Sequence, residues 1–469
     1  MDIKKSRKEL IKNTGIIAIG TLCSKIVSFF LLPLYTAVLS TDDYGTVDVL
    51  QTIASLALPF ITLELSSAVF RFLIEDKNDK SIISSAFIVE LINVIAFCVI
   101  ALMINLFYPI KYCGLFVFYF FTHAFWTFSQ NIVRGYGNNK LYSFMSFVVT
   151  STSAGLNILF ILVFKMKGDS ILLAASISYL LTIIIAVFVL KIWKQISLKK
   201  VSVDSLKRML SYCLPLIPNA ISWWVANTSD RLIIRGFLGA DSNGIYAAAN
   251  KIPAIYITLY NVYNIAWIEA LAKSSGDKKQ EQFINDMFQK SVRLFGCISL
   301  MIICTMSIFF NKLIGSNYSQ AYVHIMILVI AIFINSMCSL VGGIFTSFKR
   351  SDVIGKTTVL GALANIIINL MLVKFIGLYA ASISTLISYL VILIARSKNL
   401  KKLMNLKWPT NYLIQFVIMM LYVAISYISK NLIVNIICFV ITFAWMCIAN
   451  RSIVYGIFNK FRKTIIRRK

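Results

Sequence analysis

The chain has 469 residues, of which 59% are hydrophobic, with a mean hydropathy of +0.80 and a formal net charge of +27. A soluble protein of this length would expose more apolar surface than its polar side chains can cover. The basic residues stand in short clusters between apolar runs, not along one continuous face, which argues against nucleic-acid binding. We therefore expect one integral membrane protein that crosses the bilayer many times.

Apolar runs long enough to cross the membrane follow one another along almost the whole chain. A helix needs roughly 20 such residues to cross a hydrocarbon layer of ~30 Å. The first six predicted spans are 14–39, 46–70, 82–108, 112–134, 143–164 and 170–192. The next six are 211–236, 244–271, 288–311, 319–347, 355–374 and 377–396, and two more are 410–429 and 431–450. The first run is longer than the core of a signal peptide, so we expect it to be a retained helix.

The basic residues alternate between the gaps that separate these spans. Most of the 46 lie in every second gap, and the opposite gaps hold only isolated lysines. Because cytoplasmic loops carry the excess of lysine and arginine, the alternation predicts fourteen spans with both termini in the cytoplasm. The richer gaps are 4–12, 77–80, 134–140, 191–208, 273–279, 349–356, 396–407 and 451–469.

The sequence contains an internal repeat. LSTDDYG at residues 39–45 follows the first span, and LGADSNG at 238–244 follows the seventh. AASIS occurs at 174–178 in the sixth span and again at 380–384 in the twelfth. The repeating unit is thus six helices, and an even number preserves direction, so the halves are predicted to be parallel repeats that meet at a central cavity. The alternative is chance similarity within low-complexity apolar sequence.

Polar residues at helical spacing form stripes on the first two spans of each half. A charge inside a span is costly unless it faces protein or water, which marks it as functional. The simplest arrangement has all four helices lining one hydrated cavity; a plain ion pair between Asp230 and Arg231 is the alternative for those two residues. The candidate cavity residues are Lys25, Gln51, Asn227, Asp230, Arg231, Asn250, Lys251 and Asn261.

Signals for enzymatic or metal chemistry are weak. The segment 355–357 has the Gly-Lys-Thr of a phosphate loop, but Arg350 holds the position of the required upstream glycine. The nine cysteines form no CxxC pair and lie mostly inside apolar runs, and only two histidines, His123 and His324, are present. Both histidines are interpreted as packing residues. We expect no catalytic residues, no cofactor and no metal site.

Several segments resemble one family of membrane exporters. LSYCLPLIPN at 210–219, ISWW at 221–224, SDR at 229–231 and NGIY at 243–246 look like the seventh-helix region of bacterial polysaccharide flippases. These are the Wzx-type members of the multidrug/oligosaccharidyl-lipid/polysaccharide exporter superfamily. NTG at 13–15, LPLY at 32–35 and YG at 44–45 are similar to that family's first helix and loop. The resemblance runs over most of the chain.

The resemblance implies a fold, a location and a function. The fold is all-α, with a six-helix bundle over residues 1–200, a second over 201–400, and two extra spans with a basic cytoplasmic tail over 401–469. The protein would flip undecaprenyl-pyrophosphate-linked oligosaccharides from the inner to the outer leaflet of the bacterial plasma membrane by alternating access. Its partners would be that substrate, membrane lipids, and a polysaccharide polymerase and glycosyltransferases. Lys25 and Lys251 occupy places comparable to the family's basic cavity residues, by helix and depth.

Three alternatives stay open. A cation-coupled multidrug exporter of the same superfamily needs acidic cavity residues, whereas the charges within the spans here are mostly basic. A flippase for the peptidoglycan precursor would carry the same lipid with another head group. A membrane glycosyltransferase is disfavoured because no large outer loop is present to house its site.

Overall fold

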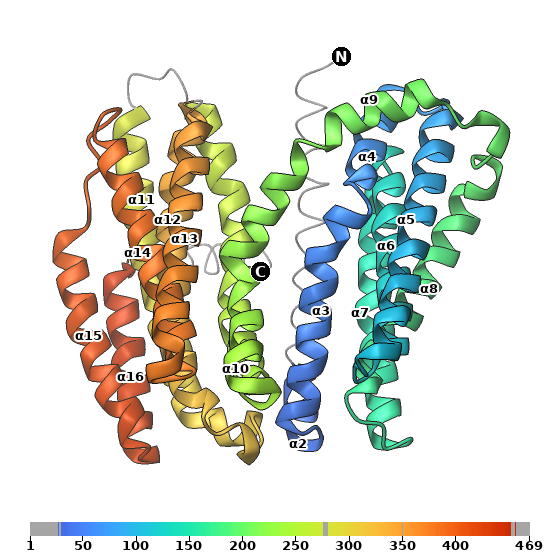
Figure 1. Cartoon of the computed structure of the whole chain (residues 1–469). Helices are drawn as coiled ribbons and strands as arrows, with labels where there is room; N and C mark the ends of the chain where they lie inside the picture. The colour runs from blue at the N-terminus through green and yellow to red at the C-terminus, as the bar shows by residue number, and fades with distance from the viewer. Residues whose placement is uncertain (1–26, 28–29, 275–279, 349, 452–454, 456–469) are drawn as a thin grey trace, which may run out of the picture. The chain divides into compact units, whose positions relative to one another are not determined.

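The computed structural model describes residues 27, 30–274, 280–348, 350–451 and 455, most of which are helical and none of which lies in a β-strand (Figure 1). Ten of the described helices are long and apolar enough to cross a membrane. The predicted all-α membrane fold is therefore confirmed. The chain divides into two compact units, Met1–Ala247 and Ala248–Lys469.

The first unit contains the helices that follow the N-terminal segment. They are α2 (Leu32–Val38), α3 (Thr41–Ile61), α4 (Leu65–Glu75), α5 (Lys80–Phe107), α6 (Cys113–Gly135), α7 (Asn139–Leu162), α8 (Asp169–Leu190) and α9 (Val203–Cys213). Two 3₁₀ turns, η1 (Ile192–Lys194) and η2 (Leu198–Lys200), join α8 to α9. The first predicted span lies largely outside the described residues, and α2 is its described end.

The segment α10 (Leu216–Ser274) consists of two helices that meet in a kink at Gly239; it joins the two units and covers the seventh and eighth predicted spans. Its one departure from helical geometry is Gly239, with φ 85° and ψ −178°. That backbone conformation is open essentially only to glycine. Gly239 thus separates the two predicted spans without a loop between them.

The second unit continues with the helices of the C-terminal part. They are α11 (Gln280–Leu313), α12 (Ala321–Ser347), α13 (Ser351–Ile376), α14 (Tyr379–Leu400), α15 (Thr410–Ser429) and α16 (Leu432–Ala449), with the 3₁₀ turn η3 (Ser316–Tyr318) before α12. In Figure 1, α15 and α16 run beside each other, and both pack against α11.

The second predicted span, 46–70, is broken into two helices. α3 ends at Ile61 and α4 begins at Leu65, and between them Leu63 and Glu64 have φ values of 51° and 55°. The break follows Pro59, whose ring removes one helical hydrogen bond and crowds the preceding turn. The chain therefore changes direction within the membrane-spanning segment.

The AASIS repeat marks the same packing role in each unit. α8, which carries residues 174–178, packs on α6 and α7, and α14, which carries 380–384, packs on α12 and α13. The serine hydroxyls bond within their own helices: Ser178 donates to the Ala174 carbonyl at 2.6 Å, and Ser384 donates to the Ala381 carbonyl at 3.0 Å. Small residues with satisfied hydroxyls let neighbouring helix backbones approach closely in a membrane.

Basic gaps that were predicted to share one side lie together in the first unit. The Lys77 ammonium donates to the Tyr136 carbonyl at 3.2 Å, which joins the α4–α5 and α6–α7 loops. The Lys80 ammonium donates to the Lys194 carbonyl at 3.0 Å, which joins the start of α5 to η1. The three basic loops thus form one end of this unit.

Candidate functional site

The first turn of α3 carries two aspartates, Asp42 and Asp43, whose carboxylates are bound by neighbouring side chains. The Ser40 hydroxyl caps the helix by accepting from the Asp43 amide at 3.1 Å, and it donates to the Asp43 carboxylate at 2.8 Å. Tyr112 donates to the same carboxylate at 2.6 Å. The Lys111 ammonium lies 2.8 Å from Asp42 and 2.6 Å from Asp43. Hydrogen bonds to these carboxylates raise the pKa of Lys111, so it stays charged at neutral pH.

One turn further on, α3 meets α10 at two glycines. A Cβ atom on Gly45 would stand 1.9 Å from the carbonyl oxygen of Ala240, and one on Gly244 would stand 2.0 Å from that of Thr41. The Thr41 hydroxyl also donates to the Asp241 carboxylate. Gly45 and Gly244 are the final glycines of LSTDDYG and LGADSNG. The two copies of the repeat therefore contact each other at these glycines.

A cluster of charged and polar side chains follows this contact. Nε of Arg231 lies 2.7 Å from Oδ2 of Asp48, and their side chains are 23% and 15% exposed. The fully buried Asn243 donates to the same carboxylate at 3.3 Å. Tyr246 donates to Asp230 at 3.0 Å. The arginine is thus held by a carboxylate from another helix.

The other candidates of the first unit are placed only in part. Gln51 is half-buried on α3, three residues after Asp48, so the two lie on the same helix face. Asn227 belongs to α10, but its side chain is not described, and Lys25 lies outside the described residues. The Trp224 indole donates to the Ser55 hydroxyl at 3.0 Å, which continues the polar contact along α3 and α10.

The candidates of the second unit all lie on α10. Asn250 and Lys251 are half-buried, and Asn261 is exposed. Pro253, within the same helix, is compatible with a local bend. Of the eight candidate residues, the structure places Asp230 and Arg231 within one hydrogen-bonded and charged cluster; the cavity role of the set stays a prediction.

Glu90 and Arg396 were not among the candidates. Glu90 on α5 is fully buried; one carboxylate oxygen accepts from Ser66 at 3.3 Å, and the other meets no hydrogen-bond donor among the described residues. A glutamate within an apolar span was the available signal. Arg396 was counted with a basic gap, but it is buried on α14, where it donates to the Cys338 carbonyl at 2.7 Å and the Thr357 hydroxyl at 3.0 Å.

Thr357, which accepts from Arg396, is also the threonine of the Gly-Lys-Thr segment that resembles a phosphate loop. Residues 355–357 lie inside α13, in the first two turns of a helix and not in a loop after a strand. The Thr357 hydroxyl bonds to the carbonyl of Val353 at 2.8 Å as well as to Arg396. A threonine held in this way is a packing residue of the helix.

Comparison with solved structures shows the same helical fold. The lipid II flippase MurJ, in an inward closed conformation, superposes with a TM-score of 0.71 at 14% identity, over 93% of this chain and 99% of that one. An inward-facing multidrug resistance MATE transporter of the MOP superfamily gives a TM-score of 0.63 at 15% identity, over 83% and 100%. A Vibrio cholerae MATE transporter gives 0.53 at 15%, over 84% and 97%. The chain therefore has the membrane fold of MOP-superfamily exporters.

Sequence comparison adds the family. The family described as polysaccharide biosynthesis protein matches residues 10–275, more than half of the 469-residue chain, and the chain belongs to that family. An uncharacterized membrane protein of Methanocaldococcus jannaschii is 21% identical over 406 residues, which are 81% of this chain and 95% of that protein. The resemblance to polysaccharide flippase-type exporters is thus confirmed, and the fold neighbours named above are a flippase and transporters.

Proposed function

We propose that the protein flips undecaprenyl-pyrophosphate-linked oligosaccharide units from the inner to the outer leaflet of a bacterial plasma membrane by alternating access. The units would serve the assembly of a surface polysaccharide such as O-antigen or capsule. The observation that carries the proposal is membership of a polysaccharide biosynthesis family in a chain with an exporter fold. On this proposal the protein is a transporter and not an enzyme, and both termini lie in the cytoplasm.

The chemistry of the cargo fits the charges of the chain. Sugar hydroxyls are costly to bury unpaired, so the head group needs a polar cavity, while the lipid tail can stay in hydrocarbon. A pyrophosphate needs cations, and lysine serves as a point-charge partner of phosphate. Lys25 and Lys251 are the proposed phosphate partners, with Gln51, Asn227, Asn250 and Asn261 as proposed partners of the sugars. Asp230 and Arg231 complete the proposed set.

The contact between α3 and α10 supports alternating access. The Gly45–Gly244 approach and the Asp48–Arg231 pair hold the second predicted span against the segment that contains the seventh and eighth spans. In the proposed cycle this contact opens while the cargo is bound, which frees the Arg231 guanidinium for the anionic group of the cargo. We also propose that the chain is organised as a six-helix bundle over residues 1–200, a second six-helix bundle over 201–400, and two extra spans with a basic tail over 401–469.

The membrane potential would assist this transport. An anionic head group moving outward against an inside-negative potential gains ~2.3 kcal/mol per charge at ~100 mV if it crosses the full field. Flipping in vesicles is therefore expected to accelerate with an inside-negative potential. A rate that does not respond to potential would count against this part of the proposal.

The experiment uses a strain whose surface glycan depends on this gene. Lys25→Ala and Lys251→Ala, alone and together, are expected to abolish glycan export and to leave lipid-linked units accumulating inside. Lys251→Arg should retain export because it keeps the charge. Lys140→Ala, at an exposed lysine in the first turn of α7, is the matched control. Full export by the double variant would overturn the cavity assignment.

The same strain separates the alternatives. Loss of surface glycan with unchanged drug sensitivity favours the polysaccharide flippase. Increased drug sensitivity on deletion would favour a multidrug exporter, and arrested cell-wall synthesis would favour a peptidoglycan-precursor flippase. Co-purification of the polymerase or glycosyltransferases with the full-length protein would test the proposed partners.

A further inference from the structure

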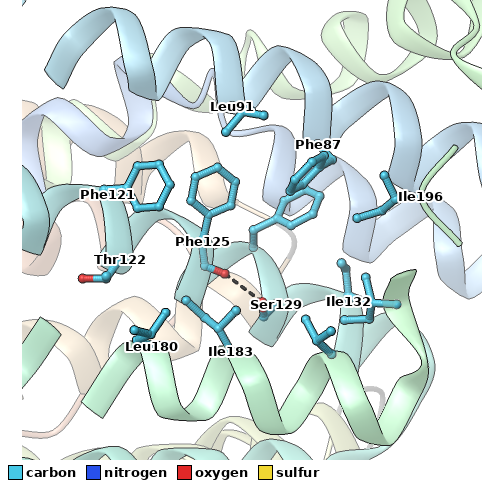
Figure 2. Close-up of a pocket in the computed structure, with 13 residues that line it drawn as sticks. Phe87, Leu91, Phe121, Thr122, Phe125, Ser129, Ile132, Leu180, Ile183 and Ile196 are labelled. Carbon is cyan, nitrogen blue, oxygen red and sulfur yellow. Dashed lines mark hydrogen bonds between the residues drawn. The ribbon is translucent and has the colours of Figure 1, made fainter. Parts of the chain in front are cut away.

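An apolar cavity lies in the first unit between α5, α6 and α8. α5 and α8 both pack against α6, and the space between them is lined by side chains of all three helices and of the chain after α8 (Figure 2). Its volume is about 190 Å³. By comparison, a dry apolar cavity of about 150 Å³ is large enough to bind benzene.

The lining of this cavity offers no polar partner to a ligand. Its two hydroxyl-bearing side chains donate to carbonyls of their own helix. Ser129 donates to Phe125 at 2.8 Å (Figure 2), and Thr122 donates to Phe118 at 2.9 Å. Phe87 closes one wall, with its ring centroid 5.7 Å from that of Phe125. Such a cavity stays dry, so its natural occupant is a hydrocarbon chain.

One end of the cavity is basic and firmly held. Ile192 and Ile196 line this end, and Ile192 is flanked in sequence by exposed Lys191 and nearby Lys194. The segment is fixed to α5, because the Ser84 hydroxyl accepts from the Ser197 amide at 3.0 Å and donates to a carbonyl of the same segment. The backbone that carries Lys191 and Lys194 is therefore held against α5, next to the apolar slot.

An aromatic side chain marks the depth of this end in the bilayer. Trp193, between the two lysines, is 47% exposed and packs edge-on against Phe188 with centroids 5.4 Å apart. Exposed tryptophans gather at the level of lipid head groups. The cavity thus runs from the head-group level into the hydrocarbon layer.

We propose that this cavity binds one acyl chain of an anionic phospholipid, whose phosphate lies on Lys191 and Lys194. Basic side chains beside a pocket between transmembrane helices attract anionic head groups, and a neutral or zwitterionic lipid would gain only the chain contact. The site differs from the proposed transport cavity, because its walls are α5, α6 and α8 whereas the cavity candidates lie on α3 and α10 or before α2. The proposal does not depend on the identity of the cargo.

The test is a lipid titration of the purified, delipidated full-length protein, with bound lipids counted by native mass spectrometry. The probes are phosphatidylglycerol, phosphatidylcholine with the same chains, and undecaprenyl phosphate. Lys191→Gln with Lys194→Gln is expected to weaken phosphatidylglycerol binding by about fivefold for each lysine, towards the affinity for phosphatidylcholine. The matched control, Lys199→Gln with Lys200→Gln, removes two exposed lysines of the same connection that do not border the cavity and should have little effect.

A second pair of variants tests the hydrocarbon slot. Ile183→Trp fills the cavity and is expected to abolish the tight binding of phosphatidylglycerol. Val189→Trp, on the exposed side of the same helix, is the control and should bind like the unmodified protein. Equal unfolding temperatures without lipid confirm that the variants fold.

Three results would overturn the proposal. Binding of phosphatidylglycerol by Ile183→Trp as tight as that by the unmodified chain would show that no acyl chain occupies this cavity. Equal losses in both lysine pairs would mean unspecific attraction to the basic end. Displacement of phosphatidylglycerol by equimolar undecaprenyl phosphate, with the same sensitivity to Ile183→Trp, would make the carrier lipid the occupant.

Discussion

Gly45 of α3 lies directly against Gly244 of α10: a Cβ atom on Gly45 would stand 2.6 Å from the Gly244 amide nitrogen. Gly45 and Gly244 are the last residues of the two copies of one repeated sequence. A side chain on either glycine would overlap backbone atoms of the opposite segment. This contact brings Asp48 within ion-pair distance of Arg231.

Alanine at either glycine should destabilise this arrangement. Gly45→Ala and Gly244→Ala each place a methyl group on a backbone carbonyl oxygen, which cannot retreat as a flexible side chain can. We expect a loss of about 1–3 kcal/mol, as for other overpacked sites, measured by thermal unfolding in detergent. Gly236→Ala on α10 is the control, since nothing lies within 4 Å of its added Cβ. An unchanged unfolding midpoint for Gly45→Ala would contradict the close approach.

Asp48 and Arg231 should be energetically coupled. Removing either partner leaves a largely buried charge without its counter-ion. The losses of unfolding free energy of Asp48→Ala and Arg231→Ala should therefore add up to more than the loss of the double variant. A double-mutant cycle on unfolding free energies is expected to give a coupling of about 1–3 kcal/mol. Strictly additive effects would show that the pair contributes no interaction energy.

Glu90 should tolerate glutamine better than alanine. A lone carboxylate is costly in an apolar interior, and Glu90 has one donor, Ser66, among the described residues. Glu90→Gln keeps the volume and removes the charge, so its unfolding temperature should equal or exceed that of the unmodified protein. Glu90→Ala leaves a cavity and should lower it by an amount that corresponds to about 2 kcal/mol or more. A loss of stability for Glu90→Gln as large as that for Glu90→Ala would contradict this prediction.

Lys111 should contribute little to stability despite its two carboxylate partners. Its side chain is 46% exposed, and exposed ion pairs contribute about 0–1 kcal/mol, less at high salt. Because the Asp42 and Asp43 carboxylates raise the pKa of Lys111, its contribution is complete below its ordinary unfolded pKa and is lost only as pH rises through the higher folded value. The stability difference between the unmodified chain and Lys111→Met is therefore expected to stay constant from pH 6 to about pH 9.

A difference that disappears within that pH range would contradict the raised pKa of Lys111. Asp43→Ala is the comparison, because Asp43 is 5% exposed and accepts from Tyr112 and Ser40 as well. It should cost more than Lys111→Met at every salt concentration.

Helix positions followed closely from hydropathy. The predicted span 410–429 coincides with α15 (Thr410–Ser429), and 82–108 differs from α5 (Lys80–Phe107) by two residues at its start. In a bilayer every backbone group must be paired inside the helix, so the length of an apolar run sets the length of the helix. The division between α3 and α4 was not predicted, although Pro59 was visible, because a proline can either bend or end a helix.

The candidate site was predicted by residue type but not by partner. An ion pair between Asp230 and Arg231 is one prediction from the sequence; the structure adds Asp48 as a partner of Arg231 and the Tyr246 hydroxyl as a partner of Asp230. Asn243 and Asp48 are 195 residues apart in the sequence. Helical periodicity predicts which face of its own helix a side chain occupies, but it does not predict which other helix packs on that face. Partners this far apart were therefore not predictable.

The sequence by itself determined the membrane class, the alternation of basic gaps, the repeat and the resemblance to polysaccharide flippases, because these depend on composition and local period. Only the tertiary structure decided that the two repeat glycines are in contact, that Arg231 forms an ion pair with Asp48, and that an apolar cavity lies next to the segment that carries Lys191. Those features arise from the packing of helices distant in sequence, where the shape of each contact depends on both partners at once.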